Sequence, residues 1–143
     1  MNKKSGFTLL ELLVVILIIT ILSTVVGVKL AGRTDEARHA AAVAQLENFR
    51  MALKLYSMDN GGLPTQRQGL QALVEPSTLD PQPRKFPKDG YLDRRTLPLD
   101  PWGNSYVYLI PGSDGESYEV ICYGHDGEPG GEDTDADIST AHM

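Results

Sequence analysis

The sequence predicts an α+β fold in which one long N-terminal helix packs on a small antiparallel β-sheet. An apolar stretch, residues 7–28, runs into an amphipathic stretch that reaches Asp59 without a proline. Near the C-terminal end, two short segments rich in Tyr, Val and Ile flank a turn that contains Pro and Gly. With 143 residues and a mass of 15.6 kDa the chain has room for one domain, which excludes a multidomain enzyme.

The apolar stretch is long enough to cross a bilayer. From Phe7 to Val28 it has 22 residues with one charge, Glu11, and as a helix it would span about 33 Å. Lys3 and Lys4 precede it and favour a cytoplasmic N-terminus, so the rest of the chain would face outward. A secretory signal peptide also starts with basic residues, but this stretch is too long for one and no small-x-small cleavage site follows it. We therefore expect a retained membrane helix, with a simple membrane anchor as the alternative.

The second half of the predicted helix has one apolar face. Apolar side chains recur at spacings of three and four residues, at Val43, Leu46, Phe49, Leu53 and Tyr56. Asn60-Gly61-Gly62 tolerates positive φ angles and Pro64 follows, so the helix should end near Asp59. Only this half has a globular domain to pack against. Lipid or other copies of the chain must bury the first half, which indicates polymerisation; a helical stalk that anchors one domain is the alternative.

The remaining chain predicts a short helix, a long irregular connection and a hairpin. Thr65 is placed to cap a short helix through Val74, and a proline-rich stretch then indicates a long irregular loop. The segments 105–110 and 116–123 have the composition of strands, and the Pro-Gly-Ser-Asp-Gly turn between them predicts a hairpin. We expect this sheet to pack on the helix, with Trp102 as a core aromatic that locks a turn.

The charge distribution argues against one class of partner. The formal net charge is −6, and no Lys or Arg follows Arg95, whereas ten acidic residues do. Nucleic acid is therefore not an expected partner, and this end of the chain is suited to binding cations. The one cysteine, Cys122, cannot form an intramolecular disulfide and lies in an alternating apolar run among acids. We interpret it as a small buried hydrophobe rather than a catalytic thiol.

The acidic residues concentrate in one glycine-rich loop near the C-terminus. They are Asp126, Glu128, Glu132, Asp133, Asp135 and Asp137, with glycines at 124, 127, 130 and 131. Hard oxygen ligands on a flexible backbone favour calcium. Asp133, Asp135 and Asp137 have the alternate spacing that opens an EF-hand, but Ile138 stands in place of its glycine, so we reject an EF-hand. A solvated acidic tail without a metal is the alternative.

Glu11 is the informative residue of the apolar helix, because a carboxylate near the start of a membrane segment is costly unless it is paired or neutral. The surrounding residues 3–11, Lys-Lys-Ser-Gly-Phe-Thr-Leu-Leu-Glu, resemble the class III signal of type IV pilins and pseudopilins. The resemblance implies that a prepilin peptidase cuts between Gly6 and Phe7 and methylates the new amino terminus of Phe7. It also implies that Glu11 meets the positive amino terminus of a neighbouring subunit, which would compensate its charge. A snorkelling Glu11 without a partner is the alternative.

A second resemblance covers nearly the whole chain. Its blocks are Leu63-Pro64-Thr65, Gln68-Gly69-Leu70-Gln71-Ala72-Leu73, Gly90-Tyr91-Leu92 and Asp100-Pro101-Trp102-Gly103-Asn104, and they resemble those of the G-type major pseudopilins in the same order. The resemblance implies a pilin-like fold. Its parts would be a leader at 1–6, an apolar transmembrane and polymerisation helix at 7–32, and a periplasmic domain at 33–143 with a calcium loop at about 124–138.

The same resemblance implies the function, the partners and the location. The chain would be the major, non-enzymatic subunit of a type II secretion pseudopilus, a helical filament that drives protein export across the outer membrane. Its partners would be its own copies, minor pseudopilins, the inner-membrane secretion platform and the prepilin peptidase. Before assembly it would be a single-pass protein of the inner membrane with its C-terminal domain in the periplasm, and afterwards part of the periplasmic pseudopilus.

The calcium ligands are also implied by resemblance. Gly124-His125-Asp126-Gly127 resembles the Gly-x-Asp-Gly block that opens the calcium loop of these pseudopilins. The implied ligands are the side chains of Asp126 and Asp137, that of Asp135 or Asp133, and the backbone carbonyls of Tyr123 and Glu128. Two features depart from the family: Gly27-Val28 stands where a proline is common, and the chain ends without the usual Asn-Trp pair.

Three other functions compete with this interpretation. A type IV pilin and a minor pseudopilin share the N-terminal signal, but the absence of a cysteine pair and the block around Trp102 count against them. A membrane-anchored, metal-dependent hydrolase would use the C-terminal carboxylates with His125 or His142. These acids share one glycine-rich loop and the histidines belong to no recognised motif, so we expect no enzymatic activity.

Overall fold

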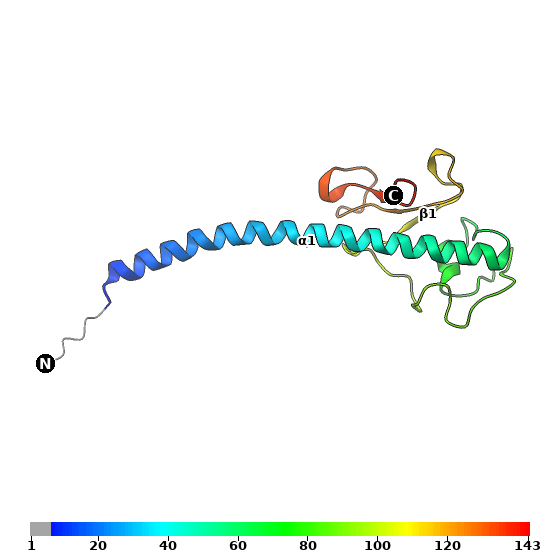
Figure 1. Ribbon diagram of the computed structural model, residues 1–143, viewed down its shortest axis with the longest axis horizontal. Helices are drawn as coiled ribbons and strands as arrows, with labels where there is room; N and C mark the ends of the chain where they lie inside the picture. Colours follow the sequence, from blue (N-terminus) through cyan, green and yellow to red (C-terminus); the bar gives the residue numbers. More distant parts are fainter. Residues whose placement is uncertain (1–6) are drawn as a thin grey trace. The chain divides into compact units, whose positions relative to one another are not determined.

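The computed structural model describes residues 7–143, apart from the side chains of residues 24–33. The chain divides into two compact units, one that ends at Ala37 and one that runs from Arg38 to Met143. Figure 1 shows the chain coloured along its sequence. The predicted leader, residues 1–6, lies outside the described residues.

The helix α1 spans Leu9–Asn60, a length of 52 residues, and confirms the single long helix predicted from the sequence. In the N-terminal unit, the large apolar side chains from Phe7 to Leu22 are 46–88% exposed. These side chains are therefore largely exposed to solvent in the single chain. Where side chains are described, no helical stretch is both long and apolar enough to qualify as a membrane span.

In the C-terminal unit, the predicted apolar face of α1 forms the core. Its buried members are Leu46, Phe49, Leu53 and Tyr56, and Val43 is partly buried. Phe49 packs edge-on against Tyr106 from the chain before the sheet, with ring centroids 5.0 Å apart. The helix ends at Asn60 because Gly61 takes a φ of 79°, and its amide donates to the Ser57 carbonyl at 2.8 Å.

The predicted short helix is only one turn of 3₁₀ helix, η1 at Leu70–Leu73, which corrects the expected extent through Val74. Thr65 and Gln68 cap the preceding turn reciprocally: the Thr65 amide donates to Gln68 Oε1 at 2.8 Å, and the Gln68 amide donates to Thr65 Oγ1 at 3.3 Å. The Gln68 side chain is buried and also donates to the carbonyls of Leu79 and Pro81. One side chain thus orders the start of the proline-rich connection.

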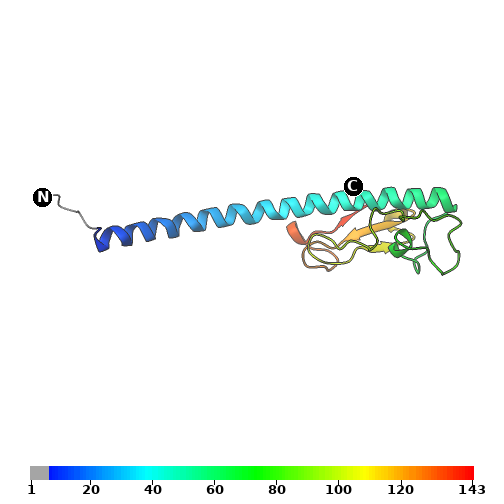
Figure 2. The same cartoon turned by 90° about the horizontal axis from the view of Figure 1, so that it is seen from below.

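Three short antiparallel strands form the sheet, in the order β1-β2-β3, and Figure 2 shows them alongside the C-terminal half of α1. β1 (Val107–Leu109) and β2 (Glu119–Cys122) confirm the predicted hairpin, with Tyr108 opposite Val120. Their connection contains the 3₁₀ turn η2 (Ser113–Gly115). β3 (Ile138–Ser139) was not predicted; it pairs with β2 and follows the 3₁₀ turn η3 (Asp133–Asp135) of the acidic loop.

Candidate functional site

Glu11 lies in the first turn of α1 and caps it. Its Oε2 atom accepts hydrogen bonds from the amide and the hydroxyl of Thr8, both at 3.1 Å, and the Glu11 amide donates to Thr8 Oγ1 at 3.2 Å. This reciprocal arrangement is a capping box, which satisfies amides that the helix itself leaves unpaired. This role was not predicted from the sequence, although Thr-x-x-Glu before an apolar run is its usual signal. Glu11 therefore has a local partner in the single chain.

The predicted processing site is described only on one side. Gly6 lies outside the described residues, whereas Phe7 is described and its side chain is 88% exposed. A residue with that exposure next to the helix start is accessible from solvent. The cut between Gly6 and Phe7 remains a prediction.

In the acidic loop, the carboxylates bind separate parts of the loop backbone. Asp126 Oδ1 accepts a hydrogen bond from the amide of Glu128 at 3.1 Å, and Asp137 Oδ2 accepts one from the amide of Gly130 at 2.9 Å. Asp135 Oδ1 lies 3.3 Å from His125 Nδ1. Among the described side chains, no group of three or more Asp, Glu, His or Cys is placed to hold a metal ion. The structure therefore does not bring three of the predicted carboxylates together.

The loop backbone is closely packed around the carbonyl of Asp135. A Cβ atom on Gly124 would lie 2.8 Å from this oxygen, and one on Gly131 would approach it even more closely. Both glycines have positive φ, at 65° and 91°, so another residue would be strained as well as crowded. The amide of His125 donates to the Thr134 carbonyl at 3.0 Å and closes the loop. Carboxylate and carbonyl oxygens on such a compact loop are donors that fit calcium chemically.

Next to this loop, Asp100 organises a turn that the sequence analysis attributed to Trp102. The side chain is 6% exposed, and its Oδ1 accepts hydrogen bonds from the amides of Trp102 and Asn104, at 2.9 and 2.8 Å. Asn104 in turn donates to the Gly124 carbonyl at 3.2 Å, which links the turn to the acidic loop. Trp102 itself is only partly buried against the core. Asp-Pro-x-Gly-Asn is the sequence signal for such a turn.

Asp100 also contacts the single cysteine. The thiol of Cys122 donates to Asp100 Oδ2 at 3.3 Å, and the Cys122 side chain is fully buried. Burial, with the nearby Asp100 carboxylate, raises the pKa of this thiol to about 12. The thiol therefore stays protonated at neutral pH. This agrees with the interpretation of Cys122 as a buried structural residue.

Two sequence profiles match the chain. The profile described as "Type II secretion system (T2SS), protein G" matches residues 29–141, and that described as "Prokaryotic N-terminal methylation motif" matches residues 1–27. The chain belongs to the type II secretion system protein G family. This confirms the resemblance to G-type pseudopilins that the sequence blocks indicated.

Relatives named "Type II secretion system core protein G" are similar over almost their full length. The protein of Pseudomonas aeruginosa is 44% identical over 137 residues, which are 96% of this chain and 94% of that one. The protein of Vibrio cholerae is 46% identical over 138 residues, covering 96% and 92%. That of Escherichia coli K12 is 45% identical over 132 residues, covering 92% and 89%.

A solved structure of a related protein has the same fold as this chain. The crystal structure of the major pseudopilin from the type 2 secretion system of enterohaemorrhagic Escherichia coli matches with a TM-score of 0.66 and 38% sequence identity. The match covers 80% of this chain and 95% of the other. The expected pilin-like α+β fold, a long helix with a small antiparallel sheet, is confirmed. The chain is thus a major pseudopilin of the type II secretion class.

Proposed function

We propose that copies of this chain polymerise through α1 into the helical filament of a type II secretion pseudopilus, which drives protein export across the outer membrane. The observation that carries the proposal is the exposure of every large apolar side chain between Phe7 and Leu22, at 46–88%. Burying one such side chain contributes about 1.5–3 kcal/mol, so a whole helix of them strongly favours a covered state. Because the chain belongs to the protein G family, we expect α1 helices of other copies to bury these side chains.

Before assembly, the inner membrane would cover the same apolar helix. The support is the sequence itself: the apolar stretch begins at Phe7 behind Lys3 and Lys4, and the matched methylation motif covers residues 1–27. A prepilin peptidase would then cut between Gly6 and Phe7 and methylate Phe7, leaving the C-terminal unit in the periplasm. Minor pseudopilins and the inner-membrane secretion platform would be its further partners.

Glu11 would have two roles, one in the single chain and one in the filament. In the single chain its Oε2 atom caps the amide of Thr8. In a bundle of apolar helices, the methylated amino terminus of a neighbouring Phe7 would supply the positive charge that a carboxylate in low dielectric requires. The capping box would hold the carboxylate at the helix end, where a neighbouring terminus can reach it.

The acidic loop would bind one structural calcium ion through Asp126, Asp137 and either Asp135 or Asp133, with backbone carbonyls of Tyr123 and Glu128. Support comes from the donor chemistry and from the compact backbone around the Asp135 carbonyl. The loop leads directly into β3, so an ion here would hold the third strand against the sheet. We infer a structural rather than a catalytic ion, because these donors share one exposed loop.

Complementation tests the proposal directly. A bacterium whose own protein G gene is deleted, but whose other secretion components are intact, would express this chain. Restored export of a type II substrate supports the proposal. The deleted gene, expressed from the same vector, is the positive control and should restore export. If it does so, but this chain does not although it is processed and present at normal levels, the proposal is overturned.

A further inference from the structure

Four cationic side chains of the segment 84–95 have no partner within the described part of the chain. They are Arg84, Lys88, Arg94 and Arg95. The ion pairs among the described residues involve other side chains. Lys85, in the same segment, is paired with Asp59 at 2.9 Å. Unpaired exposed cations are ordinary singly, but four on one short loop form a concentrated positive surface.

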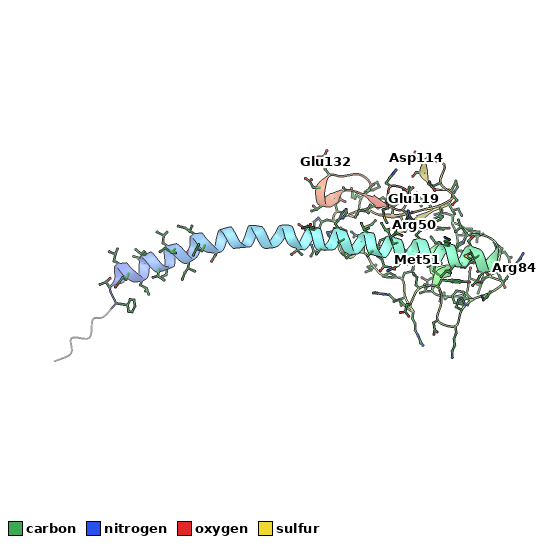
Figure 3. The ribbon with its side chains drawn as sticks, viewed as in Figure 1. Arg50, Met51, Arg84, Asp114, Glu119 and Glu132 are labelled. Atoms are coloured by element: carbon green, nitrogen blue, oxygen red, sulfur yellow. The ribbon has the colours of Figure 1, made fainter. Side chains whose placement is uncertain are left out.

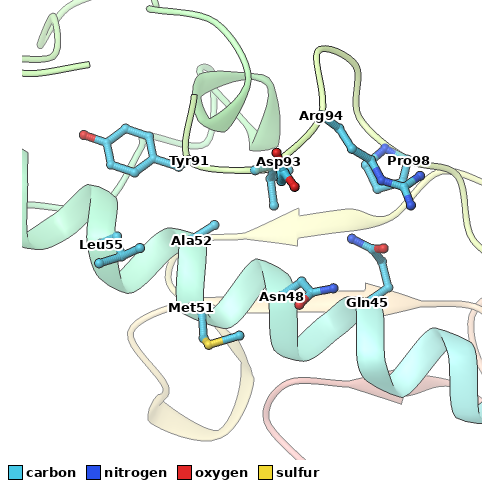
Figure 4. Close-up of a pocket in the computed structure, with 10 residues that line it drawn as sticks. Gln45, Asn48, Met51, Ala52, Leu55, Tyr91, Asp93, Arg94 and Pro98 are labelled. Atoms are coloured by element: carbon cyan, nitrogen blue, oxygen red, sulfur yellow. The ribbon is translucent and has the colours of Figure 1, made fainter. Parts of the chain in front are cut away.

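Three of these cations line one hollow of about 420 Å³, which we call the basic hollow: Lys88, Arg94 and Arg95, with Val74, Asp89 and Asp93. The adjoining groove between this loop and α1 is lined by Asp93 and Arg94 on the loop side, as Figure 4 shows. The positive charge of the basic hollow is therefore concentrated at Arg94 and Arg95. The carboxylates of Asp89 and Asp93 limit where an anionic ligand can bind in it.

The acidic loop has matching unpaired anions. Glu128, Glu132 and Asp133 are exposed, and none of their side chains has a hydrogen bond or ion pair among the described residues. Their neighbours Asp126 and Asp137 accept hydrogen bonds from loop amides instead. Because no Lys or Arg follows Arg95 in the sequence, the loop has no nearby cation in the chain segment that forms it.

The two charged surfaces do not pair with each other within one chain. Figure 3 places Glu132 at the end of the C-terminal unit that is nearer the middle of α1, whereas Arg94 of the basic hollow lies in a groove against Gln45 and Asn48 of α1. No ion pair among the described residues joins the basic hollow to the segment 128–133. Two different patches that complement each other on identical subunits form a heterologous contact, which repeats without closing and produces a helical filament.

We propose that the basic hollow of one copy receives the acidic segment 128–133 of a second copy. Arg94 and Arg95 then face Glu128 and Glu132, where guanidinium and carboxylate groups form planar bidentate pairs. Asp89 and Asp93 repel an acidic segment that is shifted along the hollow, so they fix its position. The inference rests on the proposed filament and names a contact between its subunits that the apolar helix alone does not define.

Disulfide crosslinking in filaments of the full-length chain tests the contact. Arg95→Cys combined with Glu132→Cys should form ladders of linked subunits on oxidation, because each copy offers one cysteine to each neighbour. The buried Cys122 gives little background. Arg67→Cys with Glu132→Cys is the matched control, since Arg67 is an exposed cation outside the hollow, and it should give no ladder.

Charge reversal gives a second, independent readout. Arg94→Glu with Arg95→Glu, or Glu128→Arg with Glu132→Arg, should each lower filament yield about tenfold, and the combination of all four should largely restore it. If the Arg95→Cys/Glu132→Cys variant forms filaments without the ladder, or if the combined charge variant assembles no better than either parent, the contact alone is overturned. If only Arg94→Glu with Arg95→Glu abolishes filaments, and the combination of all four substitutions does not restore them, the partner of the basic hollow is an anionic membrane. That result also overturns the proposed contact. If the wild type forms no filaments, the proposed function fails as well.

Discussion

The amide and the hydroxyl of Thr8 both donate to the same carboxylate oxygen of Glu11, each at 3.1 Å. The residue that family resemblance assigns to subunit pairing is therefore also a helix cap in the single chain. The two roles differ in what they need from the side chain: a cap needs a hydrogen-bond acceptor, whereas pairing with an ammonium group needs a negative charge. Substitutions can separate them.

Glu11→Gln should keep the cap and lose the charge, and Glu11→Ala should lose both. We expect both variants to be processed and inserted, and both to yield about tenfold fewer filaments, because each leaves the neighbouring amino terminus unpaired in an apolar bundle. Filament yield, with cleavage confirmed by mass spectrometry, is the measurement. Normal assembly of Glu11→Gln beside defective Glu11→Ala would mean that capping, and not charge, is what assembly requires.

Asp100→Ala should destabilise the chain by about 1–3 kcal/mol, because it leaves the partly buried amides of Trp102 and Asn104 without their acceptor. Chemical denaturation of the full-length chain in detergent measures this. Glu116→Ala is the control, since Glu116 is an exposed acid with an ordinary φ of −66° and its side chain forms no hydrogen bond among those described. Equal stability of the two variants would contradict the role of Asp100.

Glu119 should make the stability of the chain depend on pH. Burial opposes its ionisation, but hydrogen bonds from Ser113 and Ser139 outweigh burial and lower the pKa of this carboxyl below the ordinary value of 4.5. A lowered folded-state pKa contributes stability above the unfolded pKa, and this contribution is lost as the pH falls through the folded pKa. Wild type should therefore be more stable than Glu119→Gln at pH 6–7, and the difference should shrink below about pH 4.5. A difference that is constant with pH would refute this.

Calcium should raise the unfolding midpoint of metal-free protein, whereas magnesium should raise it less, because magnesium demands tight octahedral geometry and keeps its waters. At a concentration about 100 times the Kd, a bound ion contributes about 2.7 kcal/mol. Asp137→Ala should abolish most of the calcium effect, and Glu116→Ala, an exposed acid outside the loop, should not. Thermal unfolding with calcium, magnesium or chelator makes the comparison. A wild-type midpoint that calcium leaves unchanged would restore the solvated-tail interpretation.

The long helix, the hairpin and the buried Cys122 were predictable because each has a local signal. Apolar spacing defines the buried face of α1, and alternating Tyr, Val and Ile residues define β1 and β2. β3 was missed because two residues, Ile138 and Ser139, are too few for a periodicity, and only pairing with β2 makes them a strand.

The site chemistry was less predictable where it depends on contacts between distant segments. Asp100 was missed as the centre of its turn because its burial and its contact with Cys122 come from tertiary packing. The acidic loop could be recognised from composition. The backbone partners of Asp126 and Asp137 could not, since they depend on positive φ angles along the loop.

Electron microscopy of the sheared surface and periplasmic fractions of cells that overproduce this chain with the secretion machinery tests the central claim most directly. We predict thin helical filaments that an antibody against the chain decorates. Gly6→Ala, whose leader the peptidase should fail to remove, should yield uncleaved precursor and no filaments. Wild-type chain that is cleaved at Phe7 and abundant, yet forms no filaments under conditions where a known protein G does, would contradict the account.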